Sequence, residues 1–402
     1  MSLITRVRPV LLSAPYATPN NLEVRFHLPS GMRTCGLVEV TLDDGTTGLG
    51  EGYLAVFAPE VFRHLVLLLA PYLIGKDASE IRQRYREMCL VCDYWSQEGA
   101  ARHVISAIET ALVDAGAKQR QVPAWRFLGG TEPEPLQLYG SGGDSATPEE
   151  MAEEVALLCK LGLRMFKIRA RPGEACKAAW TLEHAGCFGM AVAVDMVQNL
   201  AHPGQRVEEA LAFLQDVRSR TRRPVAFLEE ALGLDDLERY PHLRSLADVK
   251  IAGGEIVTTA RELNRRIGLG FYDYAQPDVT VVGGMMQALE VFAACRSRRV
   301  EAVVHCWGGA VGLTANYHVA FAGGAKLAEW PMPRFELREA LFCEPLGIRH
   351  GSLQVPCGSG LGVSLTPEIE KAYAFRPDAA YRCLVPPCAL PADRVWTGGA
   401  RP

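Results

Sequence analysis

The sequence has no long apolar run. In its 402 residues the longest, residues 65–74, spans 10 residues and contains a proline, whereas a membrane-spanning helix needs about 20. Near the start of the chain Arg6 and Arg8 precede a short apolar stretch that Pro9 and Pro15 interrupt, which is unlike a signal peptide. We therefore expect a cytoplasmic protein without a membrane partner.

Neither sign of charge is in large excess. Lys and Arg total 42 against 46 Asp and Glu, the formal net charge is −4, and like charges form no run. This balance argues against a nucleic-acid partner bound through a basic surface. The apolar content of 49% is enough for a sizeable core, and the length is typical of two unequal domains.

Cysteines are too sparse for a disulfide scaffold, with 12 in the whole chain. Their one close pair, Cys89 and Cys92, has no second pair and no histidine nearby. We interpret it as two thiols on one helix face rather than as a redox or zinc motif. The glycine-rich segments 48–52 and 358–362 lack the strand-to-helix context of a nucleotide-binding loop, so we interpret them as turns.

The pattern of the chain changes near residue 130. The first 60 residues indicate strands around the turn Asp43-Asp44-Gly45, and helical periodicity then continues to about residue 118. This predicts an α+β domain over residues 1–130. After the proline-containing linker 131–135, short apolar strands alternate with amphipathic helices.

Eight such strands are predicted. They lie at residues 136–139, 163–170, 190–194, 225–228, 249–252, 272–276, 300–304 and 326–328. Between the first two, Thr147 and Pro148 begin a helix that Gly162 ends. Eight strands alternating with helices favour a parallel α/β barrel over an open sheet.

Almost every predicted strand has an ionisable residue at its carboxyl end. These residues are Lys167, Arg169, Asp195, Glu229, Glu255, Asp278, His305 and Glu329. From Lys167 on, the gaps between strands are 28, 34, 26, 23, 27 and 24 residues, each the length of one βα unit. Because the strand ends of a barrel converge on one mouth, these side chains predict a single ligand site.

Three of the carboxylates, Asp195, Glu229 and Glu255, come from consecutive strands and would repel one another in a sheltered mouth. A cation would resolve the repulsion. Ligands that are all oxygen suit Mg²⁺ better than zinc, and we expect one Mg²⁺ per active site and no other cofactor.

Two basic groups could exchange protons with a substrate. Lys167 and Arg169 share one strand face, and we expect the guanidinium and the metal to lower the pKa of the lysine so that it acts as a base. His305 is the second candidate, with Asp278 placed to fix its tautomer.

These segments resemble the enolase superfamily, and within it the mandelate racemase-like subgroup. Lys167-Ile168-Arg169 is similar to the Lys-x-Lys motif. Five further segments resemble the family's site: residues 227–231 (the Glu-Glu-Pro strand end), 251–255 (the third metal ligand), 276–278 with 283–284 (the partner of the histidine), 304–308 (the histidine) and 329–331 (the electrophilic glutamate). Outside the site, residues 106–112 through 128–130 resemble the helix that joins cap to barrel, and residues 360–363 resemble the late return of the chain.

The resemblance implies a modified TIM barrel, (β/α)₇β, over residues 131–335. An α+β capping domain would precede it, and residues 336–402 would return to that cap. The implied chemistry is abstraction of the proton α to a substrate carboxylate, giving an enolate held by Mg²⁺ on Asp195, Glu229 and Glu255.

In the same family pattern Lys167 and the His305–Asp278 pair stand on opposite faces of the substrate, and Glu329 hydrogen-bonds the enolate. Substrate-binding candidates are Tyr53, Arg25, His27 and Trp307, with Asn20 and Asn21 beside them. We expect a small carboxylate substrate and a homo-oligomer.

Two positions depart from the family pattern: Val197 replaces an asparagine, for which Asn199 is a possible substitute, and Ala231 replaces a proline. We predict a lyase that dehydrates a sugar acid or related 2-hydroxy acid to a 2-keto acid. The alternatives are a racemase or epimerase that uses Lys167 and His305, and a non-catalytic barrel homologue. A cycloisomerase is less expected, because such enzymes usually pair two lysines.

Overall fold

The cap is built on an antiparallel sheet of three strands, β1 (Ile4–Pro15), β2 (Met32–Leu42) and β3 (Thr47–Glu51). The computed structural model describes residues 2–17, 21–201, 203–383 and 396. As predicted, residues 43–45 join β2 to β3 in a turn, in which Gly45 has a φ of 85°. The helices of this part are α1 (Leu22–His27), α2 (Leu54–Phe57), α3 (Pro59–Leu69), η1 (Ala70–Tyr72), α4 (Ile81–Cys92), α5 (Ala100–Gln119) and α6 (Ala124–Phe127).

Eight parallel strands make the second part of the molecule. They are β4 (Leu136–Gly142), β5 (Met165–Arg169), β6 (Ala191–Asp195), β7 (Val225–Glu229), β8 (Lys250–Gly253), β9 (Tyr274–Ala275), β10 (Glu301–Ala302) and β11 (Leu327–Pro331). Neighbours in sequence pair in order from β4 to β10, and β11 returns to pair with β4. All eight predicted strands are present, although β9 and β10 are only two residues long.

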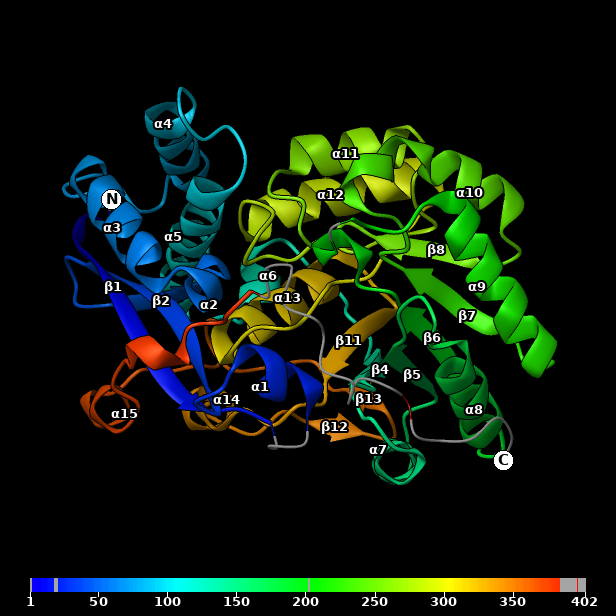
Figure 1. The fold of residues 1–402 in the computed structure, drawn as a ribbon. Helices are drawn as coiled ribbons and strands as arrows, with labels where there is room; N and C mark the ends of the chain where they lie inside the picture. Colours follow the sequence, from blue (N-terminus) through cyan, green and yellow to red (C-terminus); the bar gives the residue numbers. More distant parts are fainter. Residues whose placement is uncertain (1, 18–20, 202, 384–395, 397–402) are drawn as a thin grey trace.

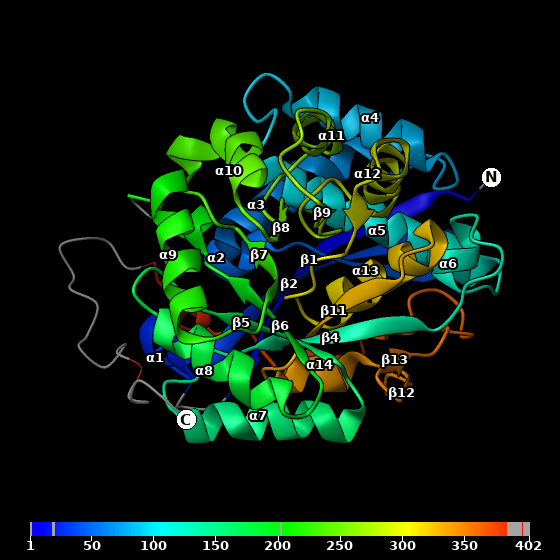
Figure 2. The same cartoon turned by 90° about the vertical axis from the view of Figure 1, so that its right-hand side faces the viewer.

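A helix follows each of the first seven barrel strands. The helices of this part are α7 (Pro148–Leu161), α8 (Ala175–Gly186), η2 (Gln198–Leu200), α9 (Val207–Arg220), η3 (Leu234–Arg239), α10 (Tyr240–Leu246), α11 (Ala260–Gly268), α12 (Met285–Arg298) and α13 (Ala310–Gly323). Figure 2 shows them arranged around the strands. The predicted modified TIM barrel, (β/α)₇β, with a cap at its side (Figure 1) is therefore confirmed.

Local sequence explains how α7 begins and ends. The Thr147 hydroxyl accepts a hydrogen bond from the backbone N–H of Glu150 at 3.2 Å, and Pro148 occupies the first helical turn. Gly162 ends the helix with a φ of 80°, a conformation that glycine adopts at little cost. The helix therefore covers β4 and β5 with a defined length.

The interior of the barrel is filled by side chains rather than open. Tyr139, Phe227 and Val303 are buried there with two alanines, and the rings of Tyr139 and Phe227 meet edge to face at 5.9 Å. This plug closes the barrel below the strand ends. Polar side chains at the upper ends therefore face a cavity that opens toward the cap alone.

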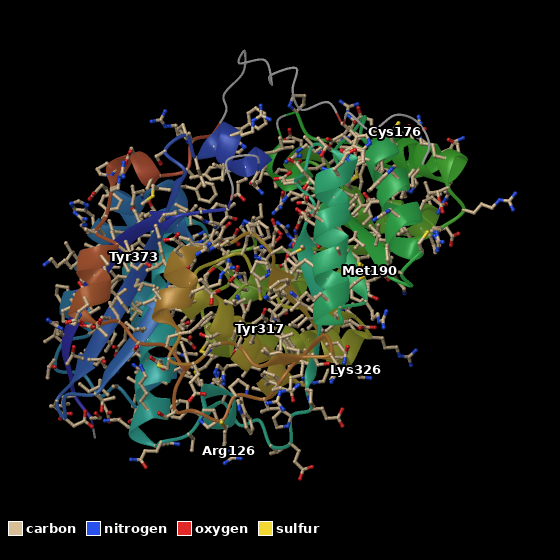
Figure 3. All side chains as sticks on the ribbon, turned by 90° about the horizontal axis from the view of Figure 1, so that it is seen from below. Arg126, Cys176, Met190, Tyr317, Lys326 and Tyr373 are labelled. Atoms are coloured by element: carbon tan, nitrogen blue, oxygen red, sulfur yellow. The ribbon has the colours of Figure 1, made fainter. Side chains whose placement is uncertain are left out.

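The last part of the chain runs back from the barrel to the cap. Its elements are α14 (Glu336–Leu341), β12 (Ile348–Arg349), β13 (Ser352–Leu353), α15 (Pro367–Ala372) and η4 (Pro377–Ala379). β13 pairs with β4, whereas Ala374 bridges Leu12 of β1 and the carbonyl oxygen of Tyr373 accepts the backbone N–H of Ser13. Figure 3 shows Tyr373 on the cap side, away from Cys176 of α8.

The domain boundaries at residues 130 and 335 stay predictions. Residues 384–395 and 397–402 of the predicted C-terminal segment lie outside the described part of the chain. Among the described residues, no helix has both the length and the apolar character needed to span a membrane.

The prediction that residues 48–52 form a turn is wrong. Gly48 and Gly50 belong to β3, which lies directly against α5. A Cβ atom on Gly50 would lie 1.8 Å from the carbonyl oxygen of Ala107, and one on Gly48 would lie 2.0 Å from that of Ala111. The missing side chains let a strand and a helix approach closely.

We expect Gly50→Ala to lower the free energy of unfolding by about 3 kcal/mol, because its methyl group would push β3 away from α5. Urea denaturation measures the change. Gly358→Ala is the control, since nothing lies within 4 Å of that position, and it should change stability by less than about 0.5 kcal/mol. Equal stabilities for the two variants would contradict the packing argument.

Candidate active site

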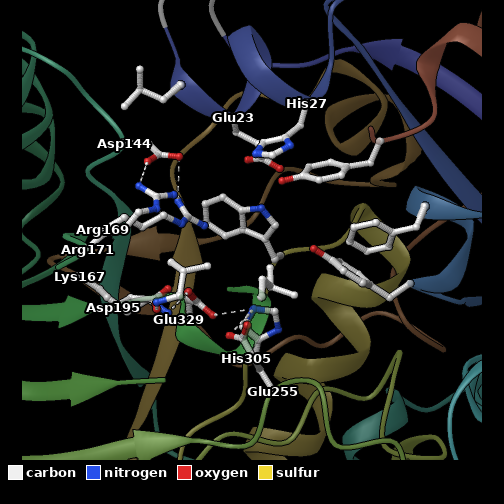
Figure 4. Close-up of a pocket in the computed structure, with 17 residues that line it drawn as sticks. Glu23, His27, Asp144, Lys167, Arg169, Arg171, Asp195, Glu255, His305 and Glu329 are labelled. Carbon is white, nitrogen blue, oxygen red and sulfur yellow. Dashed lines mark hydrogen bonds and ion pairs between the residues drawn. The ribbon is translucent and has the colours of Figure 1, made fainter. Parts of the chain in front are cut away.

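The strand ends and the cap enclose one cavity of about 670 Å³, open mouth included. Its floor is formed by predicted barrel residues: Lys167, Asp195, Glu255, His305 and Glu329. Its roof includes Glu23 and His27 from α1, Tyr53, Phe57 and the returning Tyr381. Figure 4 shows the two cap residues Glu23 and His27 facing the barrel residues across the cavity. The cavity therefore has charged groups on its barrel side and polar and aromatic groups on its cap side.

Lys167 is held between two carboxylates. Its Nζ atom contacts Glu229 Oε1 and lies 2.8 Å from Glu329 Oε1, and its side chain is only 3% exposed. Burial acts to lower the pKa of Lys167, but these two carboxylates raise it well above its usual value. These contacts oppose the lowering expected from Arg169, and the expected effect of a metal on the lysine stays a prediction.

The three proposed metal ligands lie at the same mouth. Asp195 and Glu229 end adjacent strands in register, and Glu255 follows β8 by two residues. Glu229 accepts from Gln276 Nε2 at 2.6 Å, and Glu255 accepts from Asn199 Nδ2 at 2.9 Å. These two carboxylates are therefore held by amide side chains of neighbouring elements.

The electrostatics of these carboxylates reflect their crowding. Burial raises the pKa of Glu229 to about 8, with Asp195 adding to the shift and Lys167 opposing it. Burial also raises the pKa of Asp195, and Glu255 reinforces it. Burial and mutual repulsion thus destabilise part of the negative charge at this mouth.

His305 and Asp278 form a buried pair. His305 Nδ1 lies 2.8 Å from Asp278 Oδ2, while its Nε2 lies 3.3 Å from Glu255 Oε2. Asp278 Oδ1 accepts from Thr280 and from Asn316 Nδ2, so both of its oxygens are fixed. The imidazole therefore turns its Nε2 edge toward the cavity floor, as a general acid–base needs.

Charge around the pair favours the protonated histidine. Burial acts to lower the pKa of His305, but Glu255, Glu329 and the hydrogen bond to Asp278 raise it to about 10. Burial acts to raise the pKa of Glu329, but Lys167 and His305 lower it to about 2. An ionised Glu329 accepts hydrogen bonds, including one from the Cys306 backbone N–H at 2.7 Å. The family resemblance implies that Glu329 hydrogen-bonds the enolate, and Glu329 must gain a proton before it can donate that bond.

The side wall of the cavity has balanced charge. Arg169 Nη1 lies 3.9 Å from one oxygen of Asp144, and Arg171 Nη1 lies 3.6 Å from the other. The guanidinium of Arg169 also stacks 4.1 Å over the ring of Trp307. Glu23 faces this group from α1, where its carboxylate accepts from the Tyr16 hydroxyl at 3.0 Å.

Only some of the predicted substrate-binding residues line the cavity. Tyr53, His27 and Trp307 line the cavity, whereas Arg25 is exposed and is not among its lining residues. Asn21 caps α1, accepting from the backbone N–H groups of Glu23 and Val24. Asn20 lies outside the described residues.

Sequence reasoning missed several cavity residues. Tyr381 reaches the site from the C-terminal segment and stacks on His27 with ring centroids 4.5 Å apart. Glu23, Asp144 and Arg171 were also missed, because they lie in loops or on the cap, off the βα period that located the others. The proximity of Glu23 to the candidate His27 in sequence was the only signal for any of them.

Comparison with known families decides the relationship. Residues 150–369 match the family described as enolase C-terminal domain-like, and residues 26–129 match the mandelate racemase/muconate lactonizing enzyme N-terminal domain. The chain belongs to the mandelate racemase/muconate lactonizing enzyme family. The predicted resemblance to the enolase superfamily is confirmed.

Similar proteins carry dehydratase names. The arabinonate dehydratase of Saccharolobus solfataricus is 25% identical over 338 residues, covering 83% of this chain and 89% of the relative. The D-gluconate dehydratase of Thermoproteus tenax is 26% identical over 356 residues, covering 85% and 70%. The crystal structure of L-talarate dehydratase from Polaromonas sp. JS666, complexed with Mg and L-glucarate, is 25% identical with a TM-score of 0.77, covering 93% of this chain and 97% of that one. The predicted lyase class agrees with these relatives.

Val197, where the family pattern has an asparagine, adopts a left-handed backbone. Its φ is 52° and its ψ 33°, while its N–H donates to Asp195 Oδ1 at 2.8 Å. This conformation costs a β-branched residue about 1–2 kcal/mol, whereas asparagine tolerates it. Strain is therefore stored beside a proposed metal ligand.

We expect Val197→Asn to raise the free energy of unfolding by about 1 kcal/mol, because it relieves this backbone strain. Urea denaturation measures the gain. Leu200→Asn is the control: it makes the same kind of polar change on the cavity wall, but Leu200 is not among the residues with positive φ. A gain of equal size in both variants would show that polarity, not strain, is responsible.

Proposed function

We propose that the protein is a Mg²⁺-dependent dehydratase that converts a sugar acid to a 2-keto-3-deoxy acid. The observation that carries the proposal is the His305–Asp278 pair, whose Nε2 edge faces the same cavity floor as Asp195, Glu255 and Glu329. The dehydratase names of the relatives support the same reaction class.

The residues fit a hard divalent cation. Asp195, Glu229 and Glu255 supply only oxygen and come from neighbouring strand ends, and Asp195 and Glu229 are buried, so that their repulsion matters. Their present partners are side chains able to release them, namely Lys167, Gln276, Asn199 and His305. Mg²⁺ bound there supplies Lewis-acid stabilisation of negative charge on the substrate carboxylate.

His305 would move the protons of the reaction. Its Nε2 takes the proton from carbon 2 and delivers a proton to the hydroxyl leaving carbon 3, which departs as water. Asp278 holds Nδ1–H and so keeps Nε2 available in both steps. The resulting enol becomes the 2-keto acid by taking a proton from solvent at carbon 3.

Lys167 would act as a fixed positive charge. Its ammonium group is buried between Glu229 and Glu329, and it would balance their charge while the substrate carboxylate is bound nearby. With Lys167 so held, His305 presents its Nε2 to the cavity, and it acts as the base once that nitrogen has lost the proton that Glu255 and Glu329 favour. This favours dehydration over racemisation, which needs a base on each face of the carbon.

The side wall supports a substrate with a neutral polyhydroxy tail. Arg169 and Arg171 both face Asp144, and Glu23 stands near them, so these four charges balance. Carboxylates accept and guanidinium groups donate hydrogen bonds, which together suit hydroxyl groups. Because Arg169 and Arg171 are already paired with Asp144, a second carboxylate on the tail would add a negative charge without a free counter-charge, so we propose a monocarboxylic sugar acid.

Incubation with Mg²⁺ and panels of mono- and dicarboxylic sugar acids in D₂O tests this function. We expect a 2-keto-3-deoxy product from monocarboxylic acids, with one solvent deuteron at carbon 3, detected by NMR. His305→Asn should reduce its formation by at least about 100-fold. Epimers labelled at carbon 2 without keto acid would instead identify a racemase. Turnover of dicarboxylic acids alone would overturn the tail assignment, and no exchange in either panel would indicate a non-catalytic homologue.

We expect removal of Mg²⁺ by chelation to abolish turnover of the acid so identified, and Glu255→Gln to weaken Mg²⁺ affinity by at least about tenfold, because an amide carries no charge for the cation. Isothermal titration calorimetry measures binding independently of activity. Glu23→Gln is the control, since Glu23 lines the roof away from the three ligands. Unchanged Mg²⁺ affinity in Glu255→Gln would refute the ligand assignment.

A further inference from the structure

Two barrel helices begin without a side-chain cap of their own. α12 starts after Gly284 and α13 after Gly309, and neither glycine can supply a capping oxygen. The first N–H groups of a helix need an acceptor when they are buried. In both helices that acceptor comes from the cap, more than 170 residues away in sequence.

Glu51, the last residue of β3, caps the N-terminus of α13. Its Oε1 accepts from the backbone N–H of Gly309 at 2.6 Å and its Oε2 accepts from that of Gly312 at 2.8 Å. Glu51 is 4% exposed, and a Cβ atom on Gly309 would lie within 3.1 Å of both carboxylate oxygens. The glycine therefore leaves room for the carboxylate.

Glu109 of α5 caps the N-terminus of α12 in the same way. Its Oε2 accepts from the N–H of Met285 at 2.7 Å and its Oε1 accepts from that of Met286 at 2.9 Å. A Cβ atom on Gly284 would lie 2.2 Å from Glu109 Oε2. Ser106, one turn earlier on α5, accepts from the N–H of Gly283 at 2.8 Å.

These contacts sit on the two loops that carry the acid–base pair. His305 lies four residues before Gly309, and Asp278 lies seven before Met285. The loops also meet each other, since a Cβ atom on Gly312 would touch both Thr280 and Glu51, and Thr280 donates to Asp278. Displacement of either loop would change the imidazole–carboxylate geometry.

We propose that Glu51 and Glu109 are positioning residues for the His305–Asp278 pair, so that the cap sets the geometry of the barrel's acid–base group as well as covering the site. This inference rests on the proposed dehydration for its kinetic readout. Neither carboxylate lines the cavity, so their effect is on the rate of chemistry and not on substrate or metal binding.

The test compares Glu51→Gln and Glu109→Gln with Asp114→Asn. Asp114 is an equally buried carboxylate of α5 that accepts backbone N–H groups from Leu49 and Leu361, but it does not touch the loops of the pair. The change from a buried carboxylate that accepts backbone N–H groups to an amide is the same, although Asp114→Asn also removes an ion pair with Lys118. All assays are made well below the unfolding midpoint of each variant.

We expect kcat to fall about 10- to 100-fold in both Gln variants, with KM and the calorimetric Mg²⁺ affinity within about twofold of the unaltered enzyme. Asp114→Asn should lose stability but keep kcat. Gly309→Ala is a second route to the same defect if Glu51→Gln does not fold, since its methyl group would press on Glu51. A kcat equal to that of Asp114→Asn in the Gln variants would overturn the proposal.

Hydrogen exchange measured by mass spectrometry separates this inference from the proposed function. The Gln variants should speed exchange by at least about tenfold in peptides covering residues 305–312 or 278–286, whereas Asp114→Asn should not. If the unaltered enzyme dehydrates no sugar acid, the proposed function fails while this readout still applies. Unchanged exchange in both segments would refute the positioning contacts themselves.

Discussion

Repulsion among buried carboxylates is the constraint on which the barrel mouth depends. Asp195, Glu229, Glu255 and Glu329 share one small volume from which most water is excluded. Buried like charges are costly unless each finds a counter-charge or a donor. Lys167 forms ion pairs with Glu229 and Glu329, and His305 lies beside Glu255 and Glu329. The groups that would do the chemistry therefore also stabilise the fold at the barrel mouth.

The same charges determine which side chains the carboxylates contact. Glu229 contacts Lys167 and Gln276, Glu255 contacts Asn199 and His305, and Asp195 accepts the backbone N–H of Val197. The raised pKa of His305 reflects that environment, because Glu255 and Glu329 stabilise its protonated form. Neutralising those carboxylates would lower the histidine pKa toward the range in which a base works at neutral pH. Under the proposed function, Mg²⁺ bound to Glu255 would therefore also affect the strength of the base.

The cap and the C-terminal segment form the side of the cavity that lies opposite the barrel. The Glu23 and His27 side chains reach down from α1, and Tyr381 returns from near the end of the described chain to stack on His27. The side wall of Asp144, Arg169 and Arg171 then offers donors and acceptors in balance. Specificity for the substrate tail is thus assembled from three distant parts of the chain, while the reacting end is held by the barrel.

Much of the fold and of the candidate site was predictable because the βα unit of a barrel recurs along the sequence. One βα unit recurs every 23 to 34 residues, so a strand-end residue such as Asp195 or His305 is located by period alone, and convergence of strand ends brings them together. The shortness of β9 and β10 was not predictable, since apolar runs extend beyond the residues that pair. The glycines of β3 were misjudged because only contact with α5 shows why a side chain is missing.

The sequence by itself determined the fold class, the chemistry available at the mouth and the family, because each depends on local period and residue type. Only the tertiary structure decided which groups face each other: Lys167 between two carboxylates, Asp144 between two arginines, and Glu51 and Glu109 on the helices behind His305 and Asp278. These contacts join residues up to 261 positions apart. No local pattern records them, since they arise from how the cap packs on the barrel.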